Sequence, residues 1–316
     1  MKEIGGYLEL EQFYGKEYYS DLIAVNNGRC ALLYILKSKK INKLYVPYYL
    51  CESVTAMCKK EGYAVEHYNI KKDFTPSFEK KLANDEALYI VNYFGQIDNE
   101  KIQLLNSQYG RIIIDNVQAF FQKPVEGVDT VYSCRKFFGV PDGGYVSTNT
   151  LLNEEIPQDV SMNRMKHILG RLEGKSASDY YADFKESDAS YKEMGLMKMS
   201  RLTKNLLKAI DYELVKKKRE ENYKYLSDKL SKYNKLSLKM IDGPYMYPFY
   251  CENGMQIKKK LAELKIFIPT LWPNVLEIGG TLEKDYAENI LPLPVDQRYD
   301  TNDMKRIVKE LLKYVQ

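Results

Sequence analysis

Short apolar runs alternate with helix-like stretches through the first 150 residues, and this alternation limits the possible folds more than any other feature. Strands are predicted at 43–47 (KLYVP), 63–68, 87–93 (ALYIVNY), 111–115 (RIIID), 128–133 and 144–148, and helices at 31–37, 50–61 and 98–109. Strands joined through helices imply right-handed crossovers and an α/β fold with a mostly parallel sheet between helices. Sheets of this kind bind ligands at the carboxyl ends of their strands.

The remainder of the chain has a different pattern. An irregular, polar, Tyr-rich region follows residue 150, and one long helix is predicted over 199–232, in which the cluster KKKREE (216–221) is interpreted as a solvated face. A strand near 245–251, a helix over 254–264 and a closing helix capped by Thr301 or Asn302 follow. These patterns predict a large α/β domain over 1–205 and a smaller α+β domain over 206–316.

Composition argues against several classes of protein. Lys and Arg outnumber Asp and Glu by only 47 to 43 and form no basic arm, so nucleic-acid binding is not expected. No apolar run approaches the roughly 20 residues of a membrane span, and none forms an export signal. Five cysteines without metal-ligand spacing indicate reduced thiols, a cytoplasmic location and no metal site. His67 and His167 stand far apart in the sequence and are interpreted as structural residues.

Three local features each allow two interpretations. Lys136 lies in a turn between two predicted strands, where a lysine is either a solvated charge or a nucleophilic amine. Asp115 ends a buried strand and is either a helix cap or a carboxylate at the ligand-binding edge. Gly28 precedes a predicted helix, whose free N–H groups offer a phosphate site, but such glycines are common. None of these features decides its own interpretation.

The order of several motifs along the chain is more informative. These motifs are NNGRCALLYILK (26–37), YVPYYLCESV (45–54), IVNYFGQ (90–96), IIIDNVQAFF (112–121), SCRKFFGVPDGGYVST (133–148), MSRL (199–202) and ILPLPV (290–295). In this order the chain resembles the DegT/DnrJ/StrS-type nucleotide-sugar aminotransferases. The resemblance implies a fold-type-I pyridoxal-phosphate (PLP) enzyme.

The resemblance also implies a role for each site residue. Lys136 would bind the cofactor covalently and shuttle a proton, with Arg135 as its cationic neighbour. Asp115 would pair with the pyridine nitrogen, and Gln118 would lie against the cofactor. The phosphate would be held by Ser133 and the turn at Gly28, Arg29 and Cys30.

The implied reaction transfers an amino group, with glutamate as the expected donor, onto a nucleotide-linked keto-sugar in polysaccharide or sugar biosynthesis, within a homodimer. Two positions depart from the family pattern. Cys51 replaces an aromatic residue expected over the cofactor ring, with Tyr48 or Tyr49 as substitutes, and Leu196 replaces an asparagine that reaches a partner subunit. These departures favour the alternative of a non-catalytic binding or regulatory protein. A dehydratase is a minor alternative because such relatives typically replace the lysine.

Overall fold

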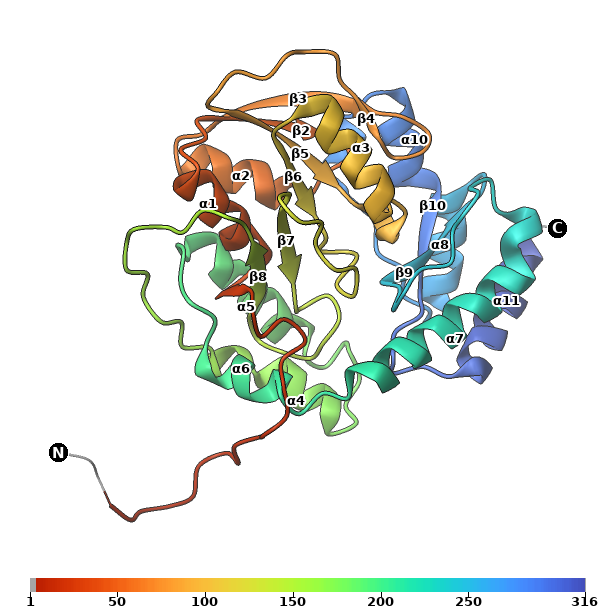
Figure 1. The fold of residues 1–316 in the computed structure, drawn as a ribbon. Helices are drawn as coiled ribbons and strands as arrows, with labels where there is room; N and C mark the ends of the chain where they lie inside the picture. The colour runs from red at the N-terminus through yellow and green to blue at the C-terminus, as the bar shows by residue number, and fades with distance from the viewer. Residues whose placement is uncertain (1–3, 316) are drawn as a thin grey trace.

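The computed structural model describes residues 4–315 and has an eight-stranded sheet at its centre (Figure 1). The strand order is β1-β8-β7-β6-β5-β2-β3-β4. The strands are β1 (Ile23–Val25), β2 (Lys43–Pro47), β3 (Ala64–Ile70), β4 (Pro76–Ser77), β5 (Glu86–Val91), β6 (Ile112–Asp115), β7 (Asp129–Ser133) and β8 (Gly144–Ser147). The run from β3 to β7 is parallel, whereas β8, β1 and β4 pair antiparallel with their neighbours. The predicted mostly parallel sheet is confirmed.

The direction of each crossover decides which face its helix covers. Helix α1 (Gly28–Ser38) connects β1 to β2, and α2 (Glu52–Lys60) connects β2 to β3, so both connections lead toward the β3 side of the sheet. Helix α3 (Asn99–Tyr109) connects β5 to β6, which leads in the opposite direction. Right-handed crossovers therefore place α1 and α2 on one face of the sheet and α3 on the other. Figure 1 shows this arrangement. The sheet is thus flanked by helices, as expected.

A second hydrophobic core forms in the C-terminal part of the chain. Strands β9 (Met246–Tyr250) and β10 (Ile290–Pro294) pair antiparallel, and α7 (Tyr212–Leu230), α8 (Gly254–Glu263) and α11 (Thr301–Val315) pack around them. Helix α10 (Thr281–Asn289) instead contributes Tyr286 and Ala287 to the core of the large sheet. The large-sheet core therefore draws side chains from beyond residue 206, and the domain boundary stays a prediction.

Several expected helix boundaries were wrong. The predicted helix over 199–232 is two helices, α6 (Arg201–Leu207) and α7, because the Asp211 side chain accepts a hydrogen bond from Leu214 N at 2.9 Å and begins a new helix. The closing helix α11 is capped by Asp300, which accepts from Asn302 N at 2.8 Å, rather than by Thr301 or Asn302. The region after residue 150 contains α4 (Lys166–Leu172) and α5 (Tyr181–Glu193), and α9 (Val275–Ile278) lies before α10.

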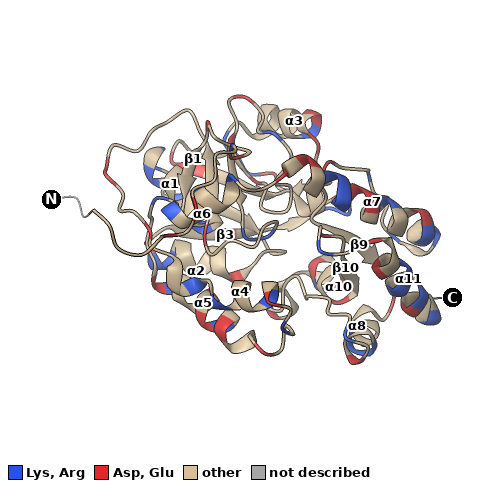
Figure 2. Ribbon diagram, turned by 90° about the horizontal axis from the view of Figure 1, so that it is seen from below, with Lys and Arg blue, Asp and Glu red and all other residues tan. Residues whose placement is uncertain are grey.

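Charged side chains of both signs alternate over the outer helices, including α7 and α11 (Figure 2). The interpretation of KKKREE as wholly solvated was wrong, because Arg219 within it is only 1% exposed. Its neighbours in the cluster face solvent to varying degrees, and Lys217 is exposed. Among residues 4–315, no helix combines the length and apolar character needed to cross a membrane.

Candidate active site

Three turns meet at the carboxyl edge of the sheet. Gly143 N donates to Asn26 O at 2.6 Å, and Cys134 N donates to Gly143 O at 3.0 Å, so the PDGG turn joins the NNGRC turn to the segment after β7. Gly143 has φ of +113°, a conformation that favours glycine. These contacts bring together motifs more than 100 residues apart in the sequence.

Gly28 allows its turn to approach β7 closely. A Cβ atom at Gly28 would lie 3.5 Å from Ser133 Cβ and 3.2 Å from Val117 Cγ1, so glycine leaves space between these segments. The first N–H groups of a helix have no carbonyl partner within the helix. In α1, Cys30 N donates instead to the side chain of Asn27, the residue before the helix, at 3.0 Å. The glycine turn and Ser133 therefore lie side by side, as the resemblance implies for a phosphate site.

Asp115 is a buried carboxylate, 3% exposed, at the end of β6. Tyr89 Oη donates to its Oδ2 at 2.7 Å, and Val117 N donates to its Oδ1 at 2.9 Å. Burial raises the pKa of Asp115, while the positive charge of Lys136 and the two hydrogen bonds act in the opposite direction. No helix begins after β6, since residues 116–122 form turns, so the helix-cap interpretation was wrong.

Lys136 lines a cavity of about 630 Å³ between the two parts of the chain. Its Nζ lies 5.5 Å from the centre of the Tyr245 ring. The cavity wall combines aromatic rings with cationic groups, contributed by Arg135, Phe137, Phe138, His167, Arg171, Phe184, Arg219 and Arg298. A lysine in this position lines a cavity and has positively charged side chains around it.

Arg135 and His167 line the cavity on the side formed by α4 and α5. The Arg135 guanidinium lies 4.2 Å from the Tyr191 ring centre and 3.6 Å from Asp188 Oδ1, so its charge is partly matched there. Burial lowers the pKa of His167, and the charge of Arg135 lowers it further. The placement of His167 in the cavity wall was not expected from the sequence.

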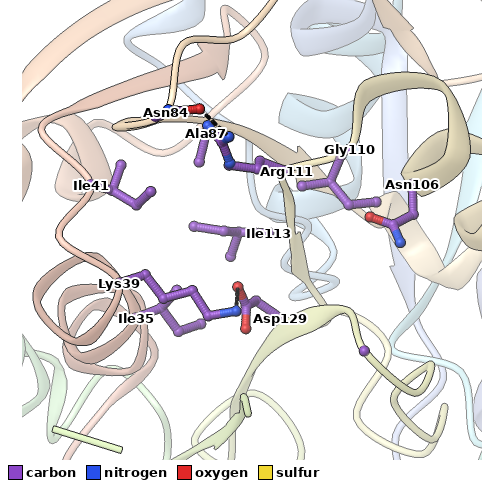
Figure 3. Close-up of a pocket in the computed structure, with 12 residues that line it drawn as sticks. Ile35, Lys39, Ile41, Asn84, Ala87, Asn106, Gly110, Arg111, Ile113 and Asp129 are labelled. Carbon is purple, nitrogen blue, oxygen red and sulfur yellow. Dashed lines mark hydrogen bonds and ion pairs between the residues drawn. The ribbon is translucent and has the colours of Figure 1, made fainter. Parts of the chain in front are cut away.

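A different cavity, of about 200 Å³, lies at the opposite end of the parallel strands (Figure 3). Lys39 Nζ and Asp129 Oδ2 pair across it at 2.8 Å, and Arg111 binds the carbonyl of Ala83 and the side chain of Asn84. Asp129 begins β7, so this cavity is at the amino-terminal edge of the sheet. It is separate from the cavity of Lys136.

Comparison with known proteins identifies the fold. No protein-family model matches the chain, and no curated protein matches its sequence. Among solved structures, DesV of S. venezuelae has a TM-score of 0.66 at 15% identity over 93% of this chain and 84% of that one. A DegT/DnrJ/EryC1/StrS aminotransferase of Brucella abortus has 0.62 at 17% identity over 93% and 86%. NtdA of Bacillus subtilis, solved with bound PMP, has 0.66 at 14% identity over 93% and 73%.

The chain has the sugar aminotransferase fold. Within this fold, the structure brings Lys136, Asp115, Ser133 and Gly28 to one edge of the sheet, where the sequence predicted a site. Arg29 follows Gly28 in the first turn of α1. The remaining residues of the sequence prediction, which include Gln118, Cys30 and Cys51, do not line the cavity of Lys136.

Gln118 and Cys30 are held by contacts within the chain. Gln118 Oε1 accepts from Phe94 N at 2.9 Å, while its buried Nε2 lacks a partner among residues 4–315. Gln118 lines a cavity of about 210 Å³ that shares no lining residue with the cavity of Lys136. The Cys30 thiol donates to Gly195 O at 3.3 Å, and burial raises its pKa to about 11.

The residues that depart from the family pattern are also placed by packing. Cys51 precedes α2, and its sulfur lies 3.1 Å from Ser53 Oγ. Tyr49 is buried among Tyr93, Trp272 and Tyr286, whereas Tyr48 stacks on His67 with ring centres 4.9 Å apart. Leu196 is buried in the core of its own chain.

Tyr89, Tyr245 and Arg219 contact the site but were missed by the sequence analysis. The alternation of strand β5 places Tyr89 on the same face as Val91, which pairs with Asp115, so a partner for its hydroxyl could have been anticipated. Arg219 continues the spacing of the buried residues Val215, Asn222, Tyr223 and Leu226. No local signal identifies Tyr245.

The raised pKa of Asp115 predicts a pH-dependent effect of Asp115→Asn on the stability of the cofactor-free protein. At pH well below 4 the carboxylate is neutral in both states, and as pH rises through its raised folded-state pKa the buried charge destabilises the folded state. The free energy of unfolding of the variant, relative to wild type, should therefore increase from pH 4 to pH 7, as measured by urea denaturation.

Asp98→Asn is the matched control for this prediction. Hydrogen bonds from the Lys239 side chain and from the backbone N–H of Lys101 lower the pKa of Asp98. Its charge therefore stabilises the folded state above pH 4, and this contribution is lost as pH falls. Relative to wild type, Asp98→Asn should lose stability as pH rises. The same slope for both variants would contradict the assignment of Asp115 as a destabilising buried charge.

Proposed function

We propose that the protein is a PLP-dependent aminotransferase that moves an amino group, from glutamate, onto a keto-sugar linked to a nucleotide. The observation that supports this most strongly is a cavity-facing lysine close enough to a buried carboxylate for its charge to oppose the rise in pKa. Five unpaired cysteine thiols support a cytoplasmic location for the reaction.

The residues present fit the cofactor in three respects. The space left by Gly28 beside Ser133, with the N–H groups of Gly28 and Arg29 at the beginning of α1, is suited to a phosphate. Asp115 offers a carboxylate to the protonated pyridine nitrogen, and Tyr89 and Val117 already orient both oxygens. PLP bound there would supply an electron sink for the amino-acid α-carbon.

Lys136 has two tasks in this proposal. Its amine would hold the cofactor, and its Nζ would move the proton at the α-carbon of the amino donor. Phe137, Phe138 and Phe184 give the cavity an apolar wall beside Lys136. Asp115 would hold the ring nitrogen of PLP in its protonated form.

The charge of the cavity supports anionic substrates. Arg135, Arg171, Arg219 and Arg298 line it, and Asp296 is the only carboxylate among its lining residues from the described chain. An excess of cationic groups in a confined cavity raises the local concentration of anions. Both the carboxylates of glutamate and the phosphates of a nucleotide-sugar carry this charge.

A non-catalytic binding protein is the second candidate. It is favoured by Cys51, which offers a thiol where an aromatic side chain would stack on the ring, and by the binding of Gln118 to Phe94. The two candidates differ in whether glutamate converts bound cofactor to its amine form.

We also propose a homodimer in which the partner closes the rim of the cavity. Two residues that line the cavity, Leu172 and Phe184, are large, apolar and exposed, at 81% and 41%. A further exposed apolar group lies on the segment before β1 that extends from the body in Figure 1, and contains Ile4, Tyr7, Leu8 and Tyr14. Exposed apolar groups next to a ligand cavity are typical of a surface that a partner covers.

Lys136 should carry the cofactor. Wild-type protein incubated with PLP and then reduced with borohydride should give a phosphopyridoxyl adduct on Lys136, identified by peptide mass mapping. Lys136→Ala should give no adduct in this peptide, whereas Lys123→Ala, at an exposed lysine whose Nζ lies 3.8 Å from the Tyr18 ring centre, should retain it. An adduct on another lysine, or none with PLP in excess, would refute the assignment.

The dimer should depend on the rim of the cavity. Sedimentation velocity should show a dimer at micromolar concentration, and Leu172→Glu should shift it toward monomer because it places a charge in an apolar interface. Leu104→Glu, at an exposed leucine on α3, should leave the dimer intact. A wild-type monomer with cofactor bound would count decisively against the proposed interface.

A further inference from the structure

Arg219 is a cationic side chain buried at the junction of the two parts of the chain. It lies on α7, with only 1% of its surface exposed, and burial lowers its pKa to about 10, so that it stays protonated at neutral pH. Its Nη2 donates to Phe137 O at 3.1 Å, its Nη1 to Pro244 O at 2.9 Å, and its Nε to Gln297 Oε1 at 2.9 Å. Burying a charge in this way is costly unless its donors are satisfied.

No carboxylate within the described residues lies at ion-pair distance from Arg219. Asp296 is near enough to raise the pKa of Arg219 somewhat, but its two oxygens bind Arg298 at 2.7 and 3.0 Å. The guanidinium therefore directs its hydrogen bonds to backbone and amide oxygens instead. A hydrophobic side chain of similar volume at such a position is often neutral or stabilising, so stability alone does not explain the arginine.

The acceptors of Arg219 belong to the segments that surround Lys136. Phe137 directly follows Lys136, and its carbonyl also accepts from Gln297 Nε2 at 2.8 Å. Pro244 precedes Tyr245, whose ring lies beside Lys136 Nζ. The planar guanidinium fixes the directions of these bonds, which a lysine at the same position would not reproduce.

We propose that Arg219 is a positioning residue for Lys136. It holds the backbone after Lys136, the backbone before Tyr245 and the side chain of Gln297 in one arrangement, so that the amine faces the cavity in a fixed direction. The proposal rests on the proposed function in one respect, which is that Lys136 binds the cofactor covalently. A misdirected amine lowers the rate of covalent bonding to the cofactor without removing the binding site of the cofactor.

The test compares covalent and non-covalent binding in Arg219→Lys, Arg219→Met and a control, Arg306→Lys. Arg306 donates to Leu264 O on the surface, far along the chain from the site. The rate of adduct formation on Lys136 is measured by rapid mixing with PLP and borohydride trapping. Affinity is measured with pyridoxamine phosphate, which has the same phosphate and ring but cannot react with an amine.

Both Arg219 variants should form the adduct at least about tenfold more slowly while binding pyridoxamine phosphate within about threefold of wild type, and Arg306→Lys should match wild type. Equal losses of rate and affinity would show a merely structural role and overturn the proposal, as would an unchanged rate. If wild type binds neither compound, the proposed function fails, and the positioning role is then judged by hydrogen exchange alone.

Hydrogen exchange in the cofactor-free protein provides that independent measurement. Arg219→Met should speed exchange of the amides of Phe137, Phe138 and Val140, which bond within the Lys136 turn, by about tenfold or more. Exchange in β5 should not change. Unchanged exchange in the turn, or an equal increase in β5, would contradict a local positioning role.

Discussion

The buried carboxylate of Asp115 is the constraint on which the arrangement of the site depends. Its charge lies at the end of a strand in the middle of the sheet, where water cannot solvate it, and burial raises its pKa. Tyr89 and Val117 each donate to one of its oxygens, and the positive charge of Lys136 opposes the rise in its pKa. A chain that only needed stability would place an apolar residue there. In the proposed function, this carboxylate would pair with the protonated pyridine nitrogen of the cofactor.

The edge of the sheet and the C-terminal part complete the site together. Backbone bonds between the NNGRC and PDGG turns fix the position of β7 and of the segment that carries Lys136. Asp142 in the second of these turns accepts from Ser200 N at 2.7 Å, which joins the turn to the beginning of α6. Helix α7 follows α6 and carries Arg219, which bonds the carbonyl of Phe137 in the Lys136 turn. The second hydrophobic core is therefore positioned against the first at the cavity.

The sequence predicted the central strands well because β2, β5, β6 and β7 are buried on both faces, whereas the short edge strands β1 and β4 were missed. Runs such as RIIID and ALYIV have no competing helical period, and the alternation of strands with helices leaves few topologies. The break between α6 and α7 was missed because residues 208–211 contain neither Gly nor Pro, and only the capping bond of Asp211 separates the helices. The sequence also grouped Arg219 with exposed neighbours in KKKREE, although its spacing from Val215 places it on the buried face of α7.

Single-turnover conversion of bound PLP to its amine form by glutamate, followed by absorbance, tests the central claim most directly. Asp115→Asn retains the shape of the site and should still bind the cofactor through Lys136. It should convert the cofactor about two to four powers of ten more slowly than wild type, which corresponds to roughly 3–5 kcal/mol of lost stabilisation. Conversion at the wild-type rate would show that the buried carboxylate takes no part in the chemistry, and absence of conversion by wild type would favour the non-catalytic binding protein.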